Sequence, residues 1–309
     1  MVSRRSLRRS QPALLTASMI LAVFLNLAPL SSWLPVPSPD SVAHAQRSKP
    51  DGTARPLPIP AQDTAPDLDN IIEETGKELI RRPNDAPLRF RLAYALEQRG
   101  DIDRAMEEYR AVIELSPTHV WARNNLGVLY AQRGQYDEAI GKFGEALFRD
   151  PQHETARLNS GLVFLKIGDT DAALRQFRLL LTLNPRHVEG LIGLGRVYYE
   201  QGAVDQSLVQ FREALSVDPQ SATAHRFLGK ALMKKGQFPE AVSAYRSAVE
   251  IQPRDAQLRY ELAQVLDAQG KRPDAINELR RLLAQPQGSD GQAVRRLAET
   301  TLQRWGDAR

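Results

Sequence analysis

Three histidines are spaced so regularly that they first suggest metal binding. His119, His153 and His187 follow one another at intervals of 34 residues. Imidazole is a common zinc ligand, but a zinc site holds all of its ligands about 2 Å from one ion. If the interval marks a repeated unit of packed helices, equivalent positions lie roughly 10 Å apart, because packed helices are separated by about 8 to 10 Å. The spacing therefore predicts solvated loop positions and no shared metal site.

Other reactive groups are equally scarce. The chain of 309 residues contains no cysteine, which excludes disulfides, thiolate metal sites and cysteine nucleophiles. It contains no glycine-rich phosphate loop, nucleophile elbow or metalloprotease helix motif at the required spacing. The sequence predicts a protein that is not an enzyme and has no cofactor, no metal and no small-molecule substrate.

The positive net charge is concentrated at the start of the chain. Of 41 basic and 37 acidic residues, Arg4, Arg5, Arg8, Arg9 and Asp40 lie in the first 45 positions, which leaves 37 basic and 36 acidic residues beyond them. A nearly neutral remainder lacks the basic surface that a nucleic-acid-binding protein needs. The charge distribution predicts no nucleic-acid partner.

Residues 1–45 have the three parts of an export signal. Arginines are followed by an apolar run from Ala13 to Leu30, and Ala43 and Ala45 flank His44 in the pattern that signal peptidases cleave. We expect cleavage after Ala45 and export to a periplasm or lumen, or secretion. The alternative is an uncleaved anchor, since the apolar run approaches the roughly 20 residues that span a bilayer. The leader would then be the only part of the chain in contact with the membrane.

The export route and the next segment are less specific. The stretch from Ser3 to Leu7 is similar to a twin-arginine signal, but the match is loose and paired arginines are common in ordinary signals, so we expect the general secretory route. Residues 46–66 are rich in proline and small polar residues without apolar periodicity, which predicts a disordered linker.

The remainder of the chain is periodic. Prolines recur every 34 residues at Pro83, Pro117, Pro151, Pro185, Pro219 and Pro253. Each 34-residue unit is predicted to hold two helices, a first and a second. A small residue lies midway along each first helix, where two helices approach closely: Ala93, Gly127, Gly161, Gly195, Gly229 and Ala263. A glycine suited to positive φ ends each of these helices: Gly100, Gly134, Gly168, Gly202, Gly236 and Gly270.

Each predicted second helix pairs a small residue with a bulky one four positions later. The bulky residues are Tyr109, Phe143, Phe177, Phe211, Tyr245 and Leu279, and small-to-large packing between paired helices places them in the core. Leu180 and Leu282 replace the usual late alanine, so we expect locally loosened or shifted packing there. The segments before and after the repeats predict amphipathic capping helices, the last one capped by Ser289.

With its period of 34 residues and these marks, the sequence resembles the tetratricopeptide repeat family from residue 86 to about 288. The resemblance implies an all-α, right-handed superhelix, an α-solenoid of about six helical hairpins with a capping helix at each end. The predicted segments are a leader (1–45), a linker (46–66), a capping helix (67–82), repeats at 86–119, 120–153, 154–187, 188–221, 222–255 and 256–288, and a final cap (289–309).

The resemblance also implies a concave groove lined by the first helices. The positions that match are Phe90, Tyr94, Asn124, Asn125, Val128, Leu158, Asn159, Leu162 and Leu165 in the front half, then Ile192, Arg196, Tyr199, Arg226, Phe227, Lys230, Met233, Lys234, Tyr260, Gln264 and Asp267. Several of these apolar residues could instead pack between adjacent helices. We expect a ligand with apolar side chains over the front repeats and acidic groups near Arg196, Arg226 and Lys230.

Two known binding patterns of the family are only partly present. Asn125 and Asn159 are similar to the start of an asparagine ladder that holds a peptide backbone, but Gly193 ends the series. Phe90 and Tyr94 replace the lysine and asparagine of the clamp that binds chaperone tails, so that ligand is not expected.

The function expected from these features is an exported scaffold or adaptor that binds a protein or peptide. A membrane-anchored component of a secretion, pilus or polysaccharide-export machine is the alternative. The regulatory subunit of an enzyme is a third possibility, although linker, repeats and caps leave no residues for a catalytic domain.

Overall fold

The computed structural model describes residues 67–285 and 291–306, and every element in these ranges is a helix. The helices are α3 (Leu68–Arg81), α4 (Ala86–Arg99), α5 (Ile102–Leu115), α6 (Val120–Gln132), α7 (Tyr136–Arg149), α8 (Glu154–Ile167), α9 (Thr170–Leu183), α10 (Val188–Glu200), α11 (Val204–Val217), α12 (Ala222–Lys234), α13 (Phe238–Ile251), α14 (Ala256–Ala268), α15 (Arg272–Ala284) and α16 (Gln292–Arg304). None of them is long and apolar enough to cross a bilayer. The predicted leader and linker lie outside the described residues.

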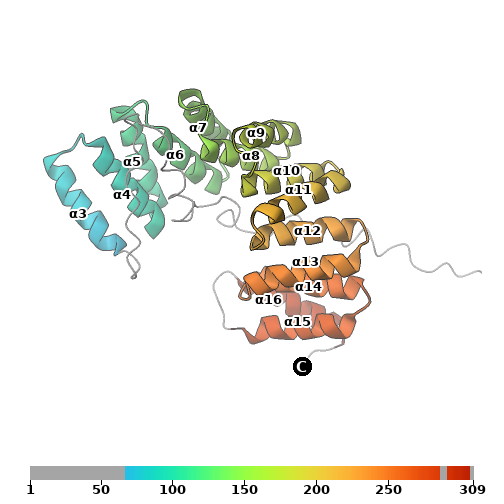
Figure 1. Cartoon of the computed structure of the whole chain (residues 1–309). Helices are drawn as coiled ribbons and strands as arrows, with labels where there is room; N and C mark the ends of the chain where they lie inside the picture. The colour runs from blue at the N-terminus through green and yellow to red at the C-terminus, as the bar shows by residue number, and fades with distance from the viewer. Residues whose placement is uncertain (1–66, 286–290, 307–309) are drawn as a thin grey trace, which may run out of the picture.

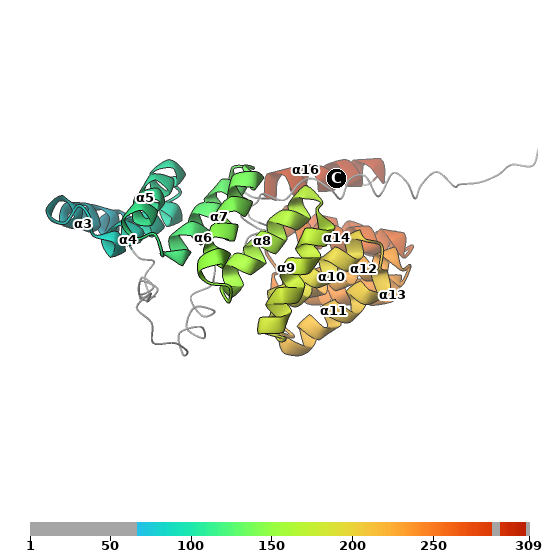
Figure 2. The same cartoon turned by 90° about the horizontal axis from the view of Figure 1, so that it is seen from above.

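The helices stack as hairpins. Six even-numbered first helices, α4 to α14, each pack against the second helix that follows, and each second helix packs against the next first helix. Figure 1 shows these pairs following one another in a curved array, and the view from above shows α3 to α7 extending to one side of the later helices (Figure 2). The predicted α-solenoid of stacked helical hairpins is confirmed.

Small residues let the two helices of a hairpin approach closely. A Cβ atom built on Gly127 would lie 2.7 Å from the Phe143 ring, and one on Gly161 would lie 2.8 Å from Phe177. The predicted core series from Tyr109 to Leu279 is fully buried. Each glycine thus leaves the space that an aromatic ring of the partner helix fills, which confirms the predicted small-to-large packing.

The turn inside each hairpin follows from a single glycine. The six glycines that end the first helices have φ between 75° and 88°, as predicted. Side chains other than glycine rarely adopt this left-handed conformation, so glycine allows the chain to turn at once into the second helix.

The expectation of loosened packing at Leu180 is wrong. Leu180 and Leu282 are fully buried. Across from Leu180, α10 carries Gly190, where an added Cβ would lie 3.0 Å from a Leu180 methyl group. The larger residue on one helix is matched by a smaller one on the next.

The apolar core runs through the whole array. Clusters of buried side chains connect α3 to α6, α6 to α8, α8 to α10 and α10 to α16. Half-buried Tyr130, Leu162 and Leu181 each pack against two successive clusters and join them. We call α4 to α9 the front half of the array and α10 to α15 the back half.

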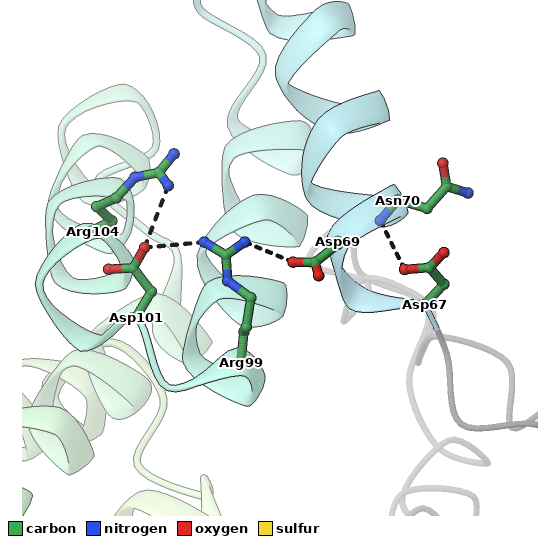
Figure 3. Close-up of polar contacts among 6 residues, drawn as sticks. All are labelled: Asp67, Asp69, Asn70, Arg99, Asp101 and Arg104. Carbon is green, nitrogen blue, oxygen red and sulfur yellow. Dashed lines mark hydrogen bonds and ion pairs between the residues drawn. The ribbon is translucent and has the colours of Figure 1, made fainter.

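The front end is closed by α3, which takes the place of a second helix. Its bounds precede those of α5 by 34 residues, so Asp69 has the repeat position of Asp103. The Arg99 guanidinium lies 2.8 Å from Asp69 and 3.1 Å from Asp101 (Figure 3). Arg133 forms the same bridge to Asp103 one repeat later. The bridge therefore ties α3 to α4 with the contact that the repeats use among themselves.

The back end is closed by α16. This helix packs on α14 and α15, and Val294, Ala298 and Leu302 are its buried residues. Its N-cap is Gly291, whereas Ser289, the predicted cap, lies outside the described residues.

Candidate functional site

The three regularly spaced histidines are helix caps. The Nδ1 atom of His119 accepts a hydrogen bond from the amide of Ala122 at 3.1 Å. His153 and His187 do the same for α8 and α10, at 3.0 and 3.2 Å. Asp85, Ser221 and Asp255 cap α4, α12 and α14 from the same repeat position. The prediction of solvated loop residues is wrong, and the capping types at the equivalent positions were the signal that could have shown it.

Capping by histidine requires a ring nitrogen that is not protonated. Burial lowers the pKa of His119, and the charge of Arg123 acts in the same direction. Phe90 stacks on the His119 ring, with 4.7 Å between the ring centroids. Burial, to which the Phe90 ring contributes, and the charge of Arg123 favour the neutral imidazole, whose Nδ1 can accept the amide hydrogen bond.

The residues predicted to line a groove divide into two groups. Six of them are buried and support the surface from behind rather than line it: Phe90, Asn124, Leu158, Asn159, Ile192 and Tyr260. The others are half-buried, apart from the exposed Lys234: Tyr94, Asn125, Val128, Leu162, Leu165, Arg196, Tyr199, Arg226, Phe227, Lys230, Met233, Gln264 and Asp267. We call this second group the first-helix surface, since all of its members lie on first helices.

In the front half, polar side chains join four helices. Asn159 of α8 donates its amide to Asn124 of α6 at 3.0 Å, and Asn124 donates to Asn125 at 3.1 Å. Asn125 donates to the Tyr109 hydroxyl at 2.9 Å, and Tyr109 donates to the Glu97 carboxylate at 2.6 Å. These five residues form a continuous hydrogen-bond chain from α8 to α4.

The end of this chain is titratable. Burial raises the pKa of Glu97 to about 7, although the hydrogen bond from Tyr109 acts in the opposite direction. Burial also raises the pKa of Tyr109 well above its usual range, with a further contribution from the Glu97 charge. Tyr109 therefore remains a phenol, and Glu97 is the member whose charge changes near neutral pH.

In the back half, a buried carboxylate lies against two cationic side chains. Glu261 of α14 is 1% exposed and accepts two hydrogen bonds from the Arg226 guanidinium of α12, at 2.8 and 2.6 Å. Lys230 lies 3.6 Å from the same carboxylate, and Gln257 donates to it at 3.0 Å. A bidentate arginine is the arrangement best suited to holding a carboxylate inside a protein.

The same region stacks its cations on aromatic rings. The Arg196 guanidinium lies 5.0 Å from the centroid of the Phe227 ring, and the Lys230 ammonium lies 5.5 Å from it. The Lys234 ammonium lies 4.4 Å above the Tyr199 ring. We call Arg196, Arg226, Lys230 and Lys234, with the rings of Tyr199 and Phe227, the cationic cluster.

Burial and neighbouring bases lower two pKa values in the cationic cluster. Burial lowers the pKa of Arg196 to about 10, despite the nearby acid Glu200. Burial, Arg226 and Arg196 together lower the pKa of Lys230, and Glu261 only partly offsets them. The acids Glu261, Glu200 and Asp255 lie near these bases, and a bound anion would further stabilise the charged forms of Arg196 and Lys230.

Sequence reasoning missed the role of Glu261 because these contacts do not follow the repeat period. Asn124 and Asn159, Arg226 and Glu261, and Tyr199 and Lys234 are each 35 residues apart, one more than the period. A search for complementary pairs at this offset would have found the buried ion pair.

Comparison with family models finds tetratricopeptide repeats over residues 77–299. A family model described as tetratricopeptide repeat matches residues 77–120, 90–154, 124–187, 158–211 and 192–256. A second tetratricopeptide repeat model matches residues 232–299. No curated protein matches the sequence.

Solved structures share the fold at low sequence identity. A chain of the APC/C hetero-tetramer Cut9–Hcn1 is 18% identical with a TM-score of 0.63; the match covers 75% of this chain but only 46% of that one. A tetratricopeptide repeat protein from Parabacteroides merdae is 20% identical with a TM-score of 0.57, over 77% and 90% of the two chains. TTC0263 of Thermus thermophilus is 20% identical with a TM-score of 0.52, over 59% and 98%. At these identities the likeness shows the fold alone.

Proposed function

The chain belongs to the tetratricopeptide repeat family, and from this premise we propose that it is an exported scaffold whose first-helix surface binds a segment of another protein. Proteins with this fold are generally protein-interaction scaffolds. Stacked hairpins support such binding because they present equivalent positions of successive repeats along one extended surface. The proposal assigns binding, and no reaction, to the chain.

The observation that carries the proposal is the cationic cluster. Its positive charges are held in place by Glu261 and by two aromatic rings, so they are arranged before any ligand arrives. A group held in its binding geometry loses little conformational entropy when a ligand docks. The cluster fits an acidic side chain or a terminal carboxylate of a bound segment.

The front half supports the apolar part of the same proposal. Tyr94, Val128, Leu162 and Leu165 are half-buried on the first helices, so part of each side chain reaches the surface. Apolar side chains along a first-helix surface fit apolar residues of a bound segment. The bound segment is therefore proposed to be apolar at the front and acidic at the back.

A peptide selection tests this proposal directly. A random peptide library is displayed on phage and selected against the 309-residue chain, and the selected peptides are labelled for fluorescence anisotropy. The peptides should be enriched in Asp, Glu and apolar residues, and their affinity should fall as salt rises. Peptides without acidic enrichment would contradict the electrostatic half of the proposal.

Lys234 and Lys235 provide a matched pair of variants. Lys234 lies over Tyr199 in the cationic cluster, whereas its neighbour Lys235 pairs with Asp205. Lys234→Glu should weaken binding of the selected peptides by about three- to fivefold, and Lys235→Glu should leave it unchanged. Equal effects of the two reversals would show that binding depends on net charge rather than on the cluster. Arg226 is unsuitable for this test because its reversal would leave Glu261 buried without its partner.

Export is proposed from the sequence of residues 1–45. N-terminal sequencing of the native protein distinguishes the alternatives, since a start after Ala45 supports cleavage and a start at Met1 supports the anchored form. The apolar run from Ala13 to Leu30 favours a membrane-anchored envelope component if cleavage does not occur.

A further inference from the structure

We propose that the charge on Glu97 sets the direction of the hydrogen-bond chain through the front half, and thereby determines whether the oxygen or the amide group of Asn159 is left without a partner at the buried end of the chain. This direction is independent of the proposed binding function, because Asn159 lies behind the first-helix surface. It can be measured without a ligand.

Every link of the chain points the same way. Asn159 donates to Asn124, Asn124 to Asn125, Asn125 to Tyr109, and Tyr109 to Glu97. At the far end, the Oδ1 atom of Asn159 is buried and accepts no hydrogen bond. The residue itself is 1% exposed, so this acceptor without a partner in the described part of the chain lies in the interior and not on the surface.

An ionised Glu97 imposes this direction. A carboxylate can only accept hydrogen bonds, so the single proton of the Tyr109 hydroxyl must point toward Glu97. The Tyr109 oxygen can then only accept from Asn125, which turns its amide nitrogen to Tyr109 and its oxygen to Asn124. The same constraint passes to Asn159, which is left with its oxygen at the end of the chain.

A protonated Glu97 permits the opposite direction. One proton taken up from solvent gives Glu97 a hydroxyl that can donate to the Tyr109 oxygen. Tyr109 can then donate to the oxygen of Asn125, once that amide has turned over, and Asn124 and Asn159 turn over in sequence. Asn159 would then present its NH₂ group, and the proton on Glu97 is the only atom added.

The charged groups near this end of α4 are paired with one another, so Glu97 is the group whose charge acts on the hydrogen-bond chain. Tyr94 lies on the same helix, and Tyr109 of α5 links Glu97 to Asn125 of α6. The charged groups at this end of α4 are already paired with one another: Asp69 of α3, Arg99, Asp101 and Arg104 form the ion-pair group of Figure 3. Because burial raises the pKa of Glu97 to about 7, both directions fall within the neutral pH range.

Nuclear magnetic resonance of the asparagine side chains tests the proposal. The ¹⁵N and ¹H shifts of the Asn159 amide are followed from pH 5 to 9 in the 309-residue chain. They should change with a midpoint near pH 7, in step with those of Asn124 and Asn125. The amide of Asn277, an exposed residue of α15, is the internal control and should not follow.

Two variants separate the chain from general pH effects. Glu97→Gln keeps the shape of the side chain without its titration, and Tyr109→Phe removes the link that passes the direction on. Both should abolish the Asn159 transition, and circular dichroism verifies that each variant is folded. Asn159 shifts that do not change with pH, or that change equally in Tyr109→Phe, would overturn the proposal.

The proposed binding function is tested separately. Asn159 is buried behind the first-helix surface, so a failed peptide selection leaves the hydrogen-bond chain unaffected, and a missing Asn159 transition leaves the peptide selection unaffected.

Discussion

The front and back halves of the array use one helical scaffold but join their first helices by different chemistry. In the front half, neutral amides and a phenol connect α8 to α4 and end at a carboxyl group with a pKa of about 7. In the back half, Arg226 and Lys230 hold Glu261, whose pKa they lower below its ordinary range although burial acts to raise it. The front half therefore ends at a group that titrates near neutral pH, whereas Glu261 in the back half is charged there.

This difference shows that the helical scaffold and the side-chain contacts that join successive first helices are separate features. The glycines, prolines and core aromatics recur with the repeat and determine the positions of the helices. The side chains 35 residues apart do not recur, so each junction between repeats can have its own chemistry. The following substitutions test this division, in decreasing order of their expected effect.

The largest effect is expected from Glu261→Ala. The substitution leaves Arg226 and Lys230 close together without the carboxylate that holds them, and loss of one partner of a buried pair costs about 3 to 5 kcal/mol of stability. Urea denaturation followed by circular dichroism measures the cost. Asp205→Ala, which breaks an exposed pair with Lys235, is the control and should cost less than about 1 kcal/mol. Similar costs for the two would show that Glu261 has no special structural role.

The second prediction concerns Glu97 and pH. Since the pKa of Glu97 is raised in the folded chain, its contribution is fully present below the ordinary carboxyl pKa and is lost as pH rises through about 7. Glu97→Gln removes this loss. Between pH 5 and pH 8 the wild type should lose on the order of 2 kcal/mol relative to the variant, as measured by denaturation at each pH. Parallel pH profiles for the two proteins would refute the prediction.

A third substitution tests whether the Phe177 ring is the reason that the asparagine series ends at Gly193. At Gly193, the position that Asn125 and Asn159 occupy in earlier repeats, a Cβ atom would lie 2.4 Å from the Phe177 ring. Gly193→Ala should therefore cost about 1 to 2 kcal/mol through overpacking. Gly141→Ala, on a helix surface with open space around it, should stabilise the chain by about 0.5 to 1 kcal/mol. Stabilisation by both substitutions would show that Phe177 does not limit the series.

The smallest effect is expected at the helix caps. Because the pKa of His119 is lowered in the folded chain, its contribution is present above the ordinary histidine pKa and is lost as pH falls below about 6.5. His119→Asp should keep the cap and reduce the loss of stability between pH 7 and pH 5 by about 0.5 to 1 kcal/mol. Ser221→Asp, at the same repeat position in the back half, should leave this pH dependence unchanged. A cap exchange that altered both profiles equally would contradict a specific role for His119.

The sequence alone was sufficient to predict the hairpins because several residue types recur at fixed positions in every repeat. Gly161 and Phe177 illustrate this, since the missing side chain of one and the large ring of the other require each other. The side-chain contacts between successive first helices were not predictable from periodicity. Whether Asn159 lines the surface or bonds to Asn124 behind it, and whether Arg226 is available or paired with Glu261, depends on the rotation of adjacent first helices, which the 34-residue period does not specify.

The stacking of the hairpins also has a mechanical consequence. Each hairpin packs on its neighbours along the array, so tension applied at the two ends of the array acts on the hairpins in series. A released hairpin of 34 residues can extend to roughly 110 to 120 Å.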